Sequence, residues 1–109
     1  MRTIASVLAI TTTLLMPMVA MAEESANVSD LKITTLSTML TELRGVGEWG
    51  YAALIEADGQ TLLFDTGARP ETVLKNAAEL GIDLSTVETV VLTHNHWDHT
   101  GGLTTLRRE

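Results

Sequence analysis

The three histidines of the chain all lie within six positions, in the segment His94-Asn95-His96-Trp97-Asp98-His99. An apolar run at residues 89–92 precedes this segment and predicts a short buried strand. Residues 100–103, Thr-Gly-Gly-Leu, follow it and predict a tight turn into a helix. The chain is therefore expected to present four potential metal ligands directly after one strand.

These side chains carry the ligand atoms that Zn²⁺ and similar divalent ions accept, imidazole nitrogen and carboxylate oxygen. His94 and His96 are two positions apart, so in extended backbone their rings point to the same side. Asp98 and His99 follow an expected bend and can face a second point nearby. The arrangement predicts a two-metal site, in which a bridging water is held as hydroxide near neutral pH.

The alternative is a polar loop in which Asp98 caps the next helix. That interpretation suits any one of these residues taken alone. The whole pattern, His-x-His-x-Asp-His, has odds on the order of one in ten thousand of arising by chance in a chain of this length. The pattern therefore favours a metal site.

The motif His94-x-His96-x-Asp98-His99, with Gly101-Gly102 behind it, resembles the signature of the metallo-β-lactamase superfamily. Residues 62–67, Leu-Leu-Phe-Asp-Thr-Gly, resemble a strand end of the same family. The wider segment 49–102 is similar to a subgroup of metal-dependent hydrolases often labelled as dihydropterin-type phosphate synthases.

The resemblance implies an α+β fold, a four-layer αβ/βα sandwich built from two similar halves. Residues 31–109 would supply the N-terminal half. The family's remaining ligands, two histidines and a bridging aspartate, are expected downstream of the motif, so the chain is expected to be a truncated part of this domain. Without a second half, one sheet face would lack its partner, and we expect the chain alone to be marginally stable and inactive.

The resemblance also implies roles for the motif residues. His94 and His96 would bind the first metal, and Asp98 and His99 the second. Asp98 would in addition act as the catalytic residue that orients the nucleophile. The expected cofactors are two divalent ions, with zinc as the first choice and iron or manganese as alternatives.

Asp65 is a carboxylate at the end of an apolar strand, where it must find hydrogen-bond partners or a cation. It either bonds the amides of Thr66 or Gly67 as a turn residue, or braces the metal-binding loop and orients a ligand histidine, as the resemblance implies. Both roles can hold together.

The N-terminus has the pattern of an export signal. A positive start, an apolar stretch at residues 4–15 and the Ala20-Met21-Ala22 cleavage pattern predict a signal peptide over residues 1–22. A membrane anchor is the alternative, but the apolar run is short and interrupted. We therefore expect a periplasmic or secreted protein without a stable membrane anchor, in which residues 23–30 form a flexible lead.

Other elements follow from periodicity and turn residues. Residues 31–35 predict a first strand, and residues 49–57 and 60–65 predict a hairpin around Asp58-Gly59. Both faces of the second hairpin strand are expected to be covered. A helix is expected from Pro70, burying Val73, Leu74, Ala77 and Leu80 and ending at Gly81.

Three aromatic residues, Trp49, Tyr51 and Trp97, either line a pocket or pack against neighbouring side chains, and we expect that they pack. The chain has no cysteine and a formal net charge of −7. The first excludes disulfides and thiolate sites, and the second disfavours binding to a nucleic-acid backbone.

The function that these observations favour is an exported hydrolase, in which a metal-bound hydroxide attacks a carbonyl or phosphoryl centre of a small molecule. Two alternatives stay open. One is a truncated, non-catalytic remnant that binds metal weakly. The other is an iron-dependent oxidoreductase on the same fold.

Overall fold

The computed structural model describes residues 27–42 and 44–108 of the chain. Its elements in order are β1 (Leu31–Ser37), β2 (Ala52–Ala57), β3 (Gln60–Phe64), α1 (Thr72–Glu79), β4 (Thr89–Val91), α2 (Trp97–Thr100) and α3 (Leu103–Leu106). The predicted signal peptide lies outside the described residues. Within them, no helix has the length and apolar character needed to cross a membrane.

The four strands form one mixed sheet in the order β1-β2-β3-β4. The first three strands are antiparallel neighbours, and β4 runs parallel to β3. Asp58 and Gly59 form the predicted two-residue turn between β2 and β3, both with positive φ (48° and 82°), as a type I′ turn requires. The parallel β3–β4 pair needs a crossover, and α1 lies within it. The predicted α+β class is confirmed.

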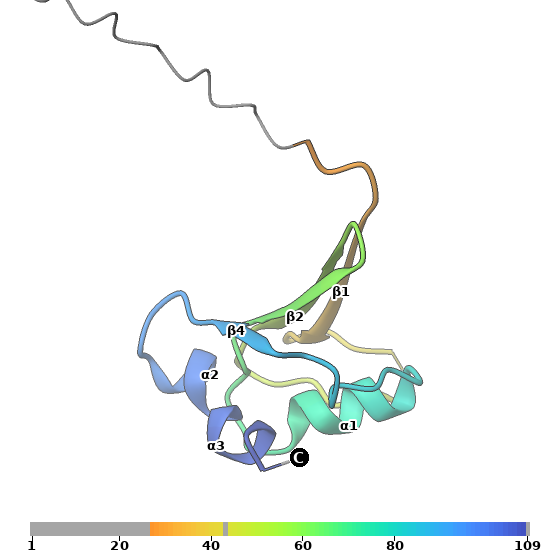
Figure 1. Ribbon diagram of the computed structural model, residues 1–109. Coiled ribbons are helices and arrows are strands. Elements are labelled where there is room, and N and C mark those ends of the chain that lie inside the picture. The colour runs from red at the N-terminus through yellow and green to blue at the C-terminus, as the bar shows by residue number, and fades with distance from the viewer. Residues whose placement is uncertain (1–26, 43, 109) are drawn as a thin grey trace, which may run out of the picture.

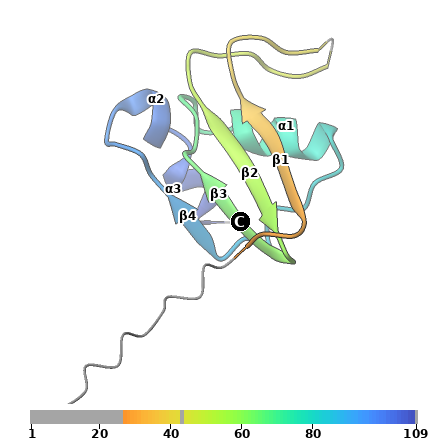
Figure 2. The same ribbon diagram turned by 90° about the horizontal axis from the view of Figure 1, so that it is seen from above.

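The core lies between the sheet and α1. Leu36, Leu54 and Leu63 from three strands meet Val73 and Ala77 from the helix, and all five are at most 4% exposed. Figure 1 shows α1 and α3 on the same side of the sheet, and Figure 2 shows α1 crossing behind the strands. Each fully buried leucine or valine contributes about 1.5–3 kcal/mol to this packing.

The other sheet face is open, so the prediction that both faces of β3 are covered is wrong for the described residues. The register places Ile33 opposite Ile55, and Ile55 opposite Leu62. Ile33 is 57% exposed, and Leu62 and Phe64 are only partly buried. The apolar run of β3 predicted coverage, but coverage needs a second layer, and the described residues place helices on one face only.

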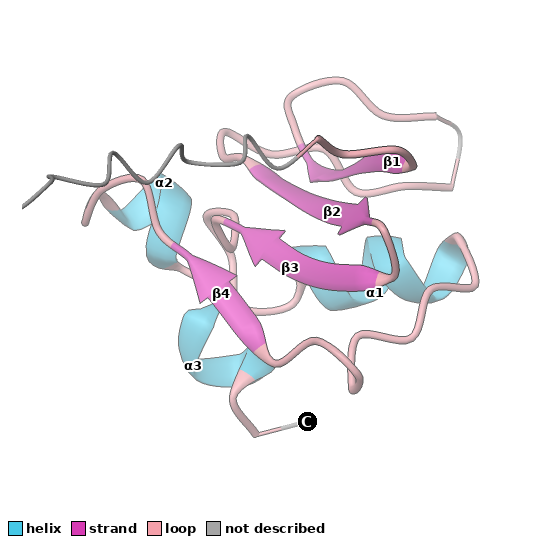
Figure 3. Ribbon diagram, turned by 45° about the horizontal axis from the view of Figure 1, so that its top comes forward, coloured by secondary structure: helices cyan, strands magenta, loops and turns pink. Residues whose placement is uncertain are grey.

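The strand β4 is exposed along its length, although its composition predicted burial. Val90 and Val91 are 37% and 39% exposed. Figure 3 shows β4 as the outermost strand of the sheet, paired with β3 alone among the described residues. The apolar residues of β4 favour its burial, but the strand is buried only where another element packs against it.

Helix α1 starts two residues later than predicted. Pro70 precedes Glu71, which is the N-cap, and the helix begins at Thr72. Leu80 is the C-cap and is 57% exposed, so it does not share the buried face of Val73 and Ala77. Gly81, with φ 68°, ends the helix as predicted.

The predicted flexible lead is described only from residue 27 onward. There, the amides of Ser29 and Asp30 donate hydrogen bonds of 3.1 and 2.8 Å to Oδ1 of Asp58 in the hairpin turn. The chain therefore contacts the β2–β3 turn immediately before β1 begins.

Candidate metal centre

The residues of the motif are divided between an extended segment and a short helix. His96 is the last extended residue, with φ −71° and ψ 148°, and it is the N-cap of α2. This helix begins at Trp97, before the two glycines, and the sequence did not predict it, whereas the helix predicted after the glycines is present as α3, from Leu103 to Leu106. Asp98 and His99 therefore lie on a helical turn, which holds them at a fixed angle to His94 and His96.

Three of the predicted ligands form a compact group. His94 Nε2 and His96 Nδ1 are 3.1 Å apart. One ligand atom each from His94, His96 and Asp98 lies within 4.8 Å of the other two. Tetrahedral zinc with bonds of about 2.0–2.1 Å holds its ligand nitrogens about 3.3 Å apart. The donor types and their spacing therefore fit one divalent ion.

The Asp98 carboxylate also faces His99. Its Oδ2 lies 3.7 Å from His99 Nε2, and the His94 and His99 rings are 4.2 Å apart between centroids. Sequence reasoning paired Asp98 with His99 for a second metal. The structure places this carboxylate near all three histidines, in one group with His94 and His96 and 3.7 Å from His99.

Asp65 lies beneath the motif and is fully buried. Its Oδ1 accepts a hydrogen bond of 2.8 Å from the Thr93 amide. Its Oδ2 accepts one of 2.7 Å from His99 Nδ1. Burial alone would raise the pKa of Asp65, but the hydrogen bonds from Thr93 and His99 outweigh it and hold the pKa below its usual value.

The turn alternative for Asp65 is not what the structure shows. The Thr66 amide donates to the His99 carbonyl, and the Gly67 amide donates to the Tyr51 carbonyl. Asp65 itself has φ 57°, a left-handed conformation that ends β3 and turns its carboxylate toward the motif. The residue is therefore in direct contact with one predicted ligand, His99.

Backbone contacts seat α2 against the segment that follows β3. The Thr66 hydroxyl donates a 2.9 Å bond to the His99 carbonyl, and the Gly101 amide donates a 2.9 Å bond to the Gly67 carbonyl. A Cβ on Gly101 would overlap the carbonyl of Ala68. Because φ of Gly101 is −61°, this glycine is required for space and not for an unusual backbone angle.

Glu48 is a supporting residue that sequence reasoning missed. It is 5% exposed, and burial alone would raise its pKa, but hydrogen bonds hold the pKa below its usual value. The donors are the Ser37 hydroxyl, the Ala68 and Arg69 amides and the Thr72 hydroxyl, at 2.7–3.0 Å. No local pattern marks Glu48, because its partners come from β1, the β3–α1 connection and α1.

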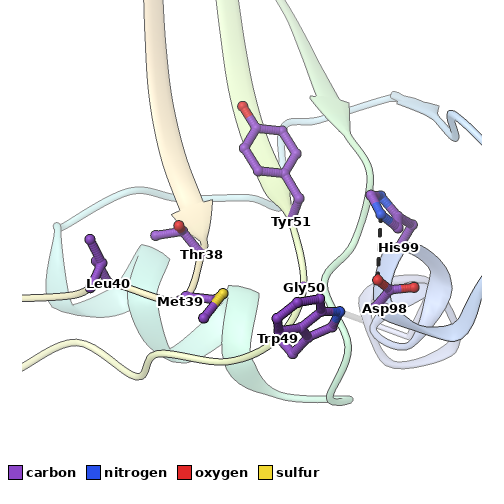
Figure 4. A pocket seen from close by; sticks show the side chains of 8 residues that line it. All are labelled: Thr38, Met39, Leu40, Trp49, Gly50, Tyr51, Asp98 and His99. Atoms are coloured by element: carbon purple, nitrogen blue, oxygen red, sulfur yellow. Dashed lines mark ion pairs between the residues drawn. The ribbon is translucent and has the colours of Figure 1, made fainter.

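A pocket of about 490 Å³ opens beside the motif (Figure 4). Its lining consists of Thr38, Met39, Leu40, Trp49, Gly50, Tyr51, Asp98 and His99. Trp49 and Trp97 are 64% exposed, so the expectation that these two aromatics pack is wrong, whereas the Tyr51 ring packs edge-to-face against the Phe64 ring, with 6.5 Å between centroids. Trp49 and Tyr51 precede β2, and both line the pocket.

Comparisons with known proteins agree with this geometry. The family model of the metallo-beta-lactamase superfamily matches residues 49–109. A 7,8-dihydropterin-6-methyl-4-(beta-D-ribofuranosyl)-aminobenzene-5'-phosphate synthase of Methanocaldococcus jannaschii is 38% identical over 64 residues, covering 55% of this chain and 22% of that protein. The anti-Pycsar protein Apyc1 of Saccharibacillus brassicae is 47% identical over 51 residues, covering 47% of this chain and 20% of that protein. A ribonuclease Z of Mycobacterium avium is 41% identical over 54 residues, covering 50% of this chain and 18% of that protein.

One solved structure is also similar. Tm1679, described as a metal-dependent hydrolase of the beta-lactamase superfamily, matches with a TM-score of 0.56 and 35% identity, over 68% of this chain and 26% of that one. The chain thus spans about a fifth of the length of the curated relatives it matches. The family match covers more than half of the chain and includes the motif and the strand end that carries Asp65. The chain belongs to the metallo-beta-lactamase superfamily.

Proposed function

We propose that the protein is an exported, metal-dependent hydrolase that acts on a carbonyl or phosphoryl centre of a small molecule. The observation that carries this proposal is the group formed by His94, His96 and Asp98, whose ligand atoms lie within 4.8 Å of one another. Divalent metal ions, when bound, activate water as the attacking nucleophile and stabilise the negative charge that develops on the substrate oxygen.

The chain's own residues divide the remaining tasks. His94 and His96 would hold the first ion, and Asp98 together with His99 would hold the second. Asp98 lies close to both sets of ligands and would orient the nucleophile. Asp65 accepts a hydrogen bond from His99 Nδ1 and so orients the His99 ring. The Nε2 of that ring then faces Asp98.

The neighbouring pocket supports a small organic substrate. It is open to solvent through Trp49 and Tyr51, and it reaches Asp98 and His99. A substrate in this pocket has apolar contacts on one side and the metal ligands on the other. The net charge of −7 does not favour a polyanionic substrate such as a nucleic acid.

The test is a hydrolysis screen on the endogenous protein, with β-lactam, lactone, thioester and phosphodiester substrates in the presence and absence of a chelator. We expect turnover that the chelator abolishes and that added zinc restores. Turnover that persists in chelator would refute the proposal. Iron in the metal analysis, together with iron-dependent oxygen uptake, would favour the oxidoreductase alternative instead.

The intact mass of the endogenous protein tests the export proposal in the same preparation. Cleavage after Ala22 removes residues 1–22 and leaves Glu23 as the first residue. A mass that still includes the first 22 residues would overturn the predicted signal peptide.

A further inference from the structure

Thr93 directly precedes the first histidine of the motif, and its hydroxyl contacts three residues of the centre: Asp65, His94 and, at 3.5 Å from its Nδ1, His99. Thr93 Oγ1 lies 3.0 Å from His94 Nδ1. It also lies 2.8 Å from Oδ2 and 3.0 Å from Oδ1 of Asp65. Asp65 and His94 share no hydrogen bond of their own within residues 27–42 and 44–108, so this hydroxyl is the link between them.

The position of the hydroxyl proton follows from what each group can accept. An ionised carboxylate only accepts hydrogen bonds, and a hydroxyl has one proton to donate. If that proton were directed at His94, two acceptors would face each other at 2.8 Å between Thr93 and buried Asp65. The Thr93 hydroxyl therefore donates to Asp65 and accepts from His94.

The tautomer of His94 follows from that direction. To donate to Thr93, His94 must carry its proton on Nδ1, which leaves a lone pair on Nε2. This Nε2 lies 3.1 Å from His96 Nδ1. In the metal-free chain, His96 Nδ1–H donates to it, so donors run in one direction from His96 through His94 and Thr93 to Asp65.

We propose that Thr93 is a positioning residue, whose hydroxyl extends the influence of Asp65 to His94 and fixes the tautomer that presents Nε2 to a metal ion. One buried carboxylate then orients two ligand histidines, His99 directly and His94 through Thr93. This inference rests on the proposed metal centre. It also predicts that metal binding leaves the His94 proton on Nδ1, whereas His96 moves its proton to Nε2 to free Nδ1.

The test is ¹⁵N NMR of the histidine side chains in the full chain, at pH 8, where free imidazole is neutral. The sequence has three histidines, and all three are in the motif, so a protein without a histidine tag gives signals from this site alone. Single substitutions of histidine by glutamine assign each ring. The measurement is made without metal and again during titration with zinc.

Three variants separate the hydroxyl from other effects. Thr93→Val keeps the shape but removes the hydroxyl, and Thr93→Ser keeps the hydroxyl. Thr100→Val is the matched control, because the Thr100 hydroxyl donates only to the His96 carbonyl at 3.1 Å. We expect the Nδ1–H form of His94 in wild type, Thr93→Ser and Thr100→Val, and a gain of the Nε2–H form in Thr93→Val. Zinc affinity should fall about 10-fold or more in Thr93→Val alone.

The proposal is overturned if wild-type His94 carries its proton on Nε2, a result that needs no variant to fold. It is also overturned if folded Thr93→Val keeps both the wild-type tautomer and the wild-type zinc affinity. The tautomer measurement separates this inference from the proposed function. Nδ1–H on His94, together with turnover of the endogenous protein that persists in chelator, would support the role of Thr93 and contradict the metal-dependent hydrolase.

Discussion

Replacing Glu48 by glutamine tests whether a buried carboxylate holds the support of the metal centre together. The carboxylate accepts four hydrogen bonds, from two hydroxyls and two backbone amides. Glutamine keeps one oxygen acceptor and turns an NH₂ donor toward the donors on the other side. Glu48→Gln therefore loses two of these bonds and leaves buried donors facing a donor.

The expected cost follows from the strength of such bonds. Hydrogen bonds to a charged group contribute about 1.5–3 kcal/mol each, and their neutral counterparts contribute about 1 kcal/mol. By these values, the two lost bonds cost about 3–6 kcal/mol and the two weakened bonds about 1–4 kcal/mol, so the destabilisation is at least about 4 kcal/mol. A domain of this size is stable by about 4–12 kcal/mol in total, so Glu48→Gln should remove a large share of the free energy of unfolding.

The assay is urea unfolding of the full chain followed by far-UV circular dichroism, from which the free energy of unfolding and its urea dependence are obtained. Glu88→Gln is the matched control, because Glu88 is exposed and its side chain makes no hydrogen bond or ion pair within the described residues. We expect the control to stay within about 0.5 kcal/mol of wild type. A Glu48→Gln protein as stable as this control, with the same urea dependence, would refute the reasoning.

Three further predictions follow from the same contacts. Gly101→Ala should destabilise the chain by about 1–3 kcal/mol in the same urea assay, because its Cβ overlaps the Ala68 carbonyl; wild-type stability would contradict this. Acid should destabilise the fold, because the pKa values of Glu48 and Asp65 are lowered in the folded state. The stability that these two carboxylates contribute is complete above their usual pKa values of 4.5 and 3.8, and it is lost as the pH falls through their lower pKa values in the folded state. A free energy of unfolding that stays constant through this pH range would refute the prediction. His96→Gln should lower zinc affinity by at least about 10-fold in calorimetric titration, whereas Asn95→Gln, on the exposed residue beside it, should not; equal affinity in both variants would remove His96 from the ligand set.

The family and the strand-and-turn plan could be read from short segments of the sequence. The Asp58-Gly59 turn, the helix stop at Gly81 and the spacing of His94 and His96 all act over a few residues. Such features depend on local backbone geometry, which residue type largely decides. Residue type likewise decides which ligand atoms, imidazole nitrogens and carboxylate oxygens, the motif offers to a metal ion.

Burial and partner choice could not be read in this way. The apolar composition of β4 predicted burial and Trp49 was expected to pack, yet both are exposed, because within the described residues β4 pairs with β3 alone and Trp49 borders an open pocket. The fully buried groups of the site include carboxylates, whose place in the interior depends on donors that only the folded chain supplies.

The sequence by itself determined the family, the hairpin and the identity of the candidate ligands, since each is carried by neighbouring residues. Only the tertiary structure decided that Asp65 reaches Thr93 and His99, and that Glu48 joins β1 to α1. These contacts join residues from 11 to 34 positions apart. A hydrogen bond requires two atoms to meet within about 3 Å, and over such separations in sequence only the path of the folded backbone brings them together.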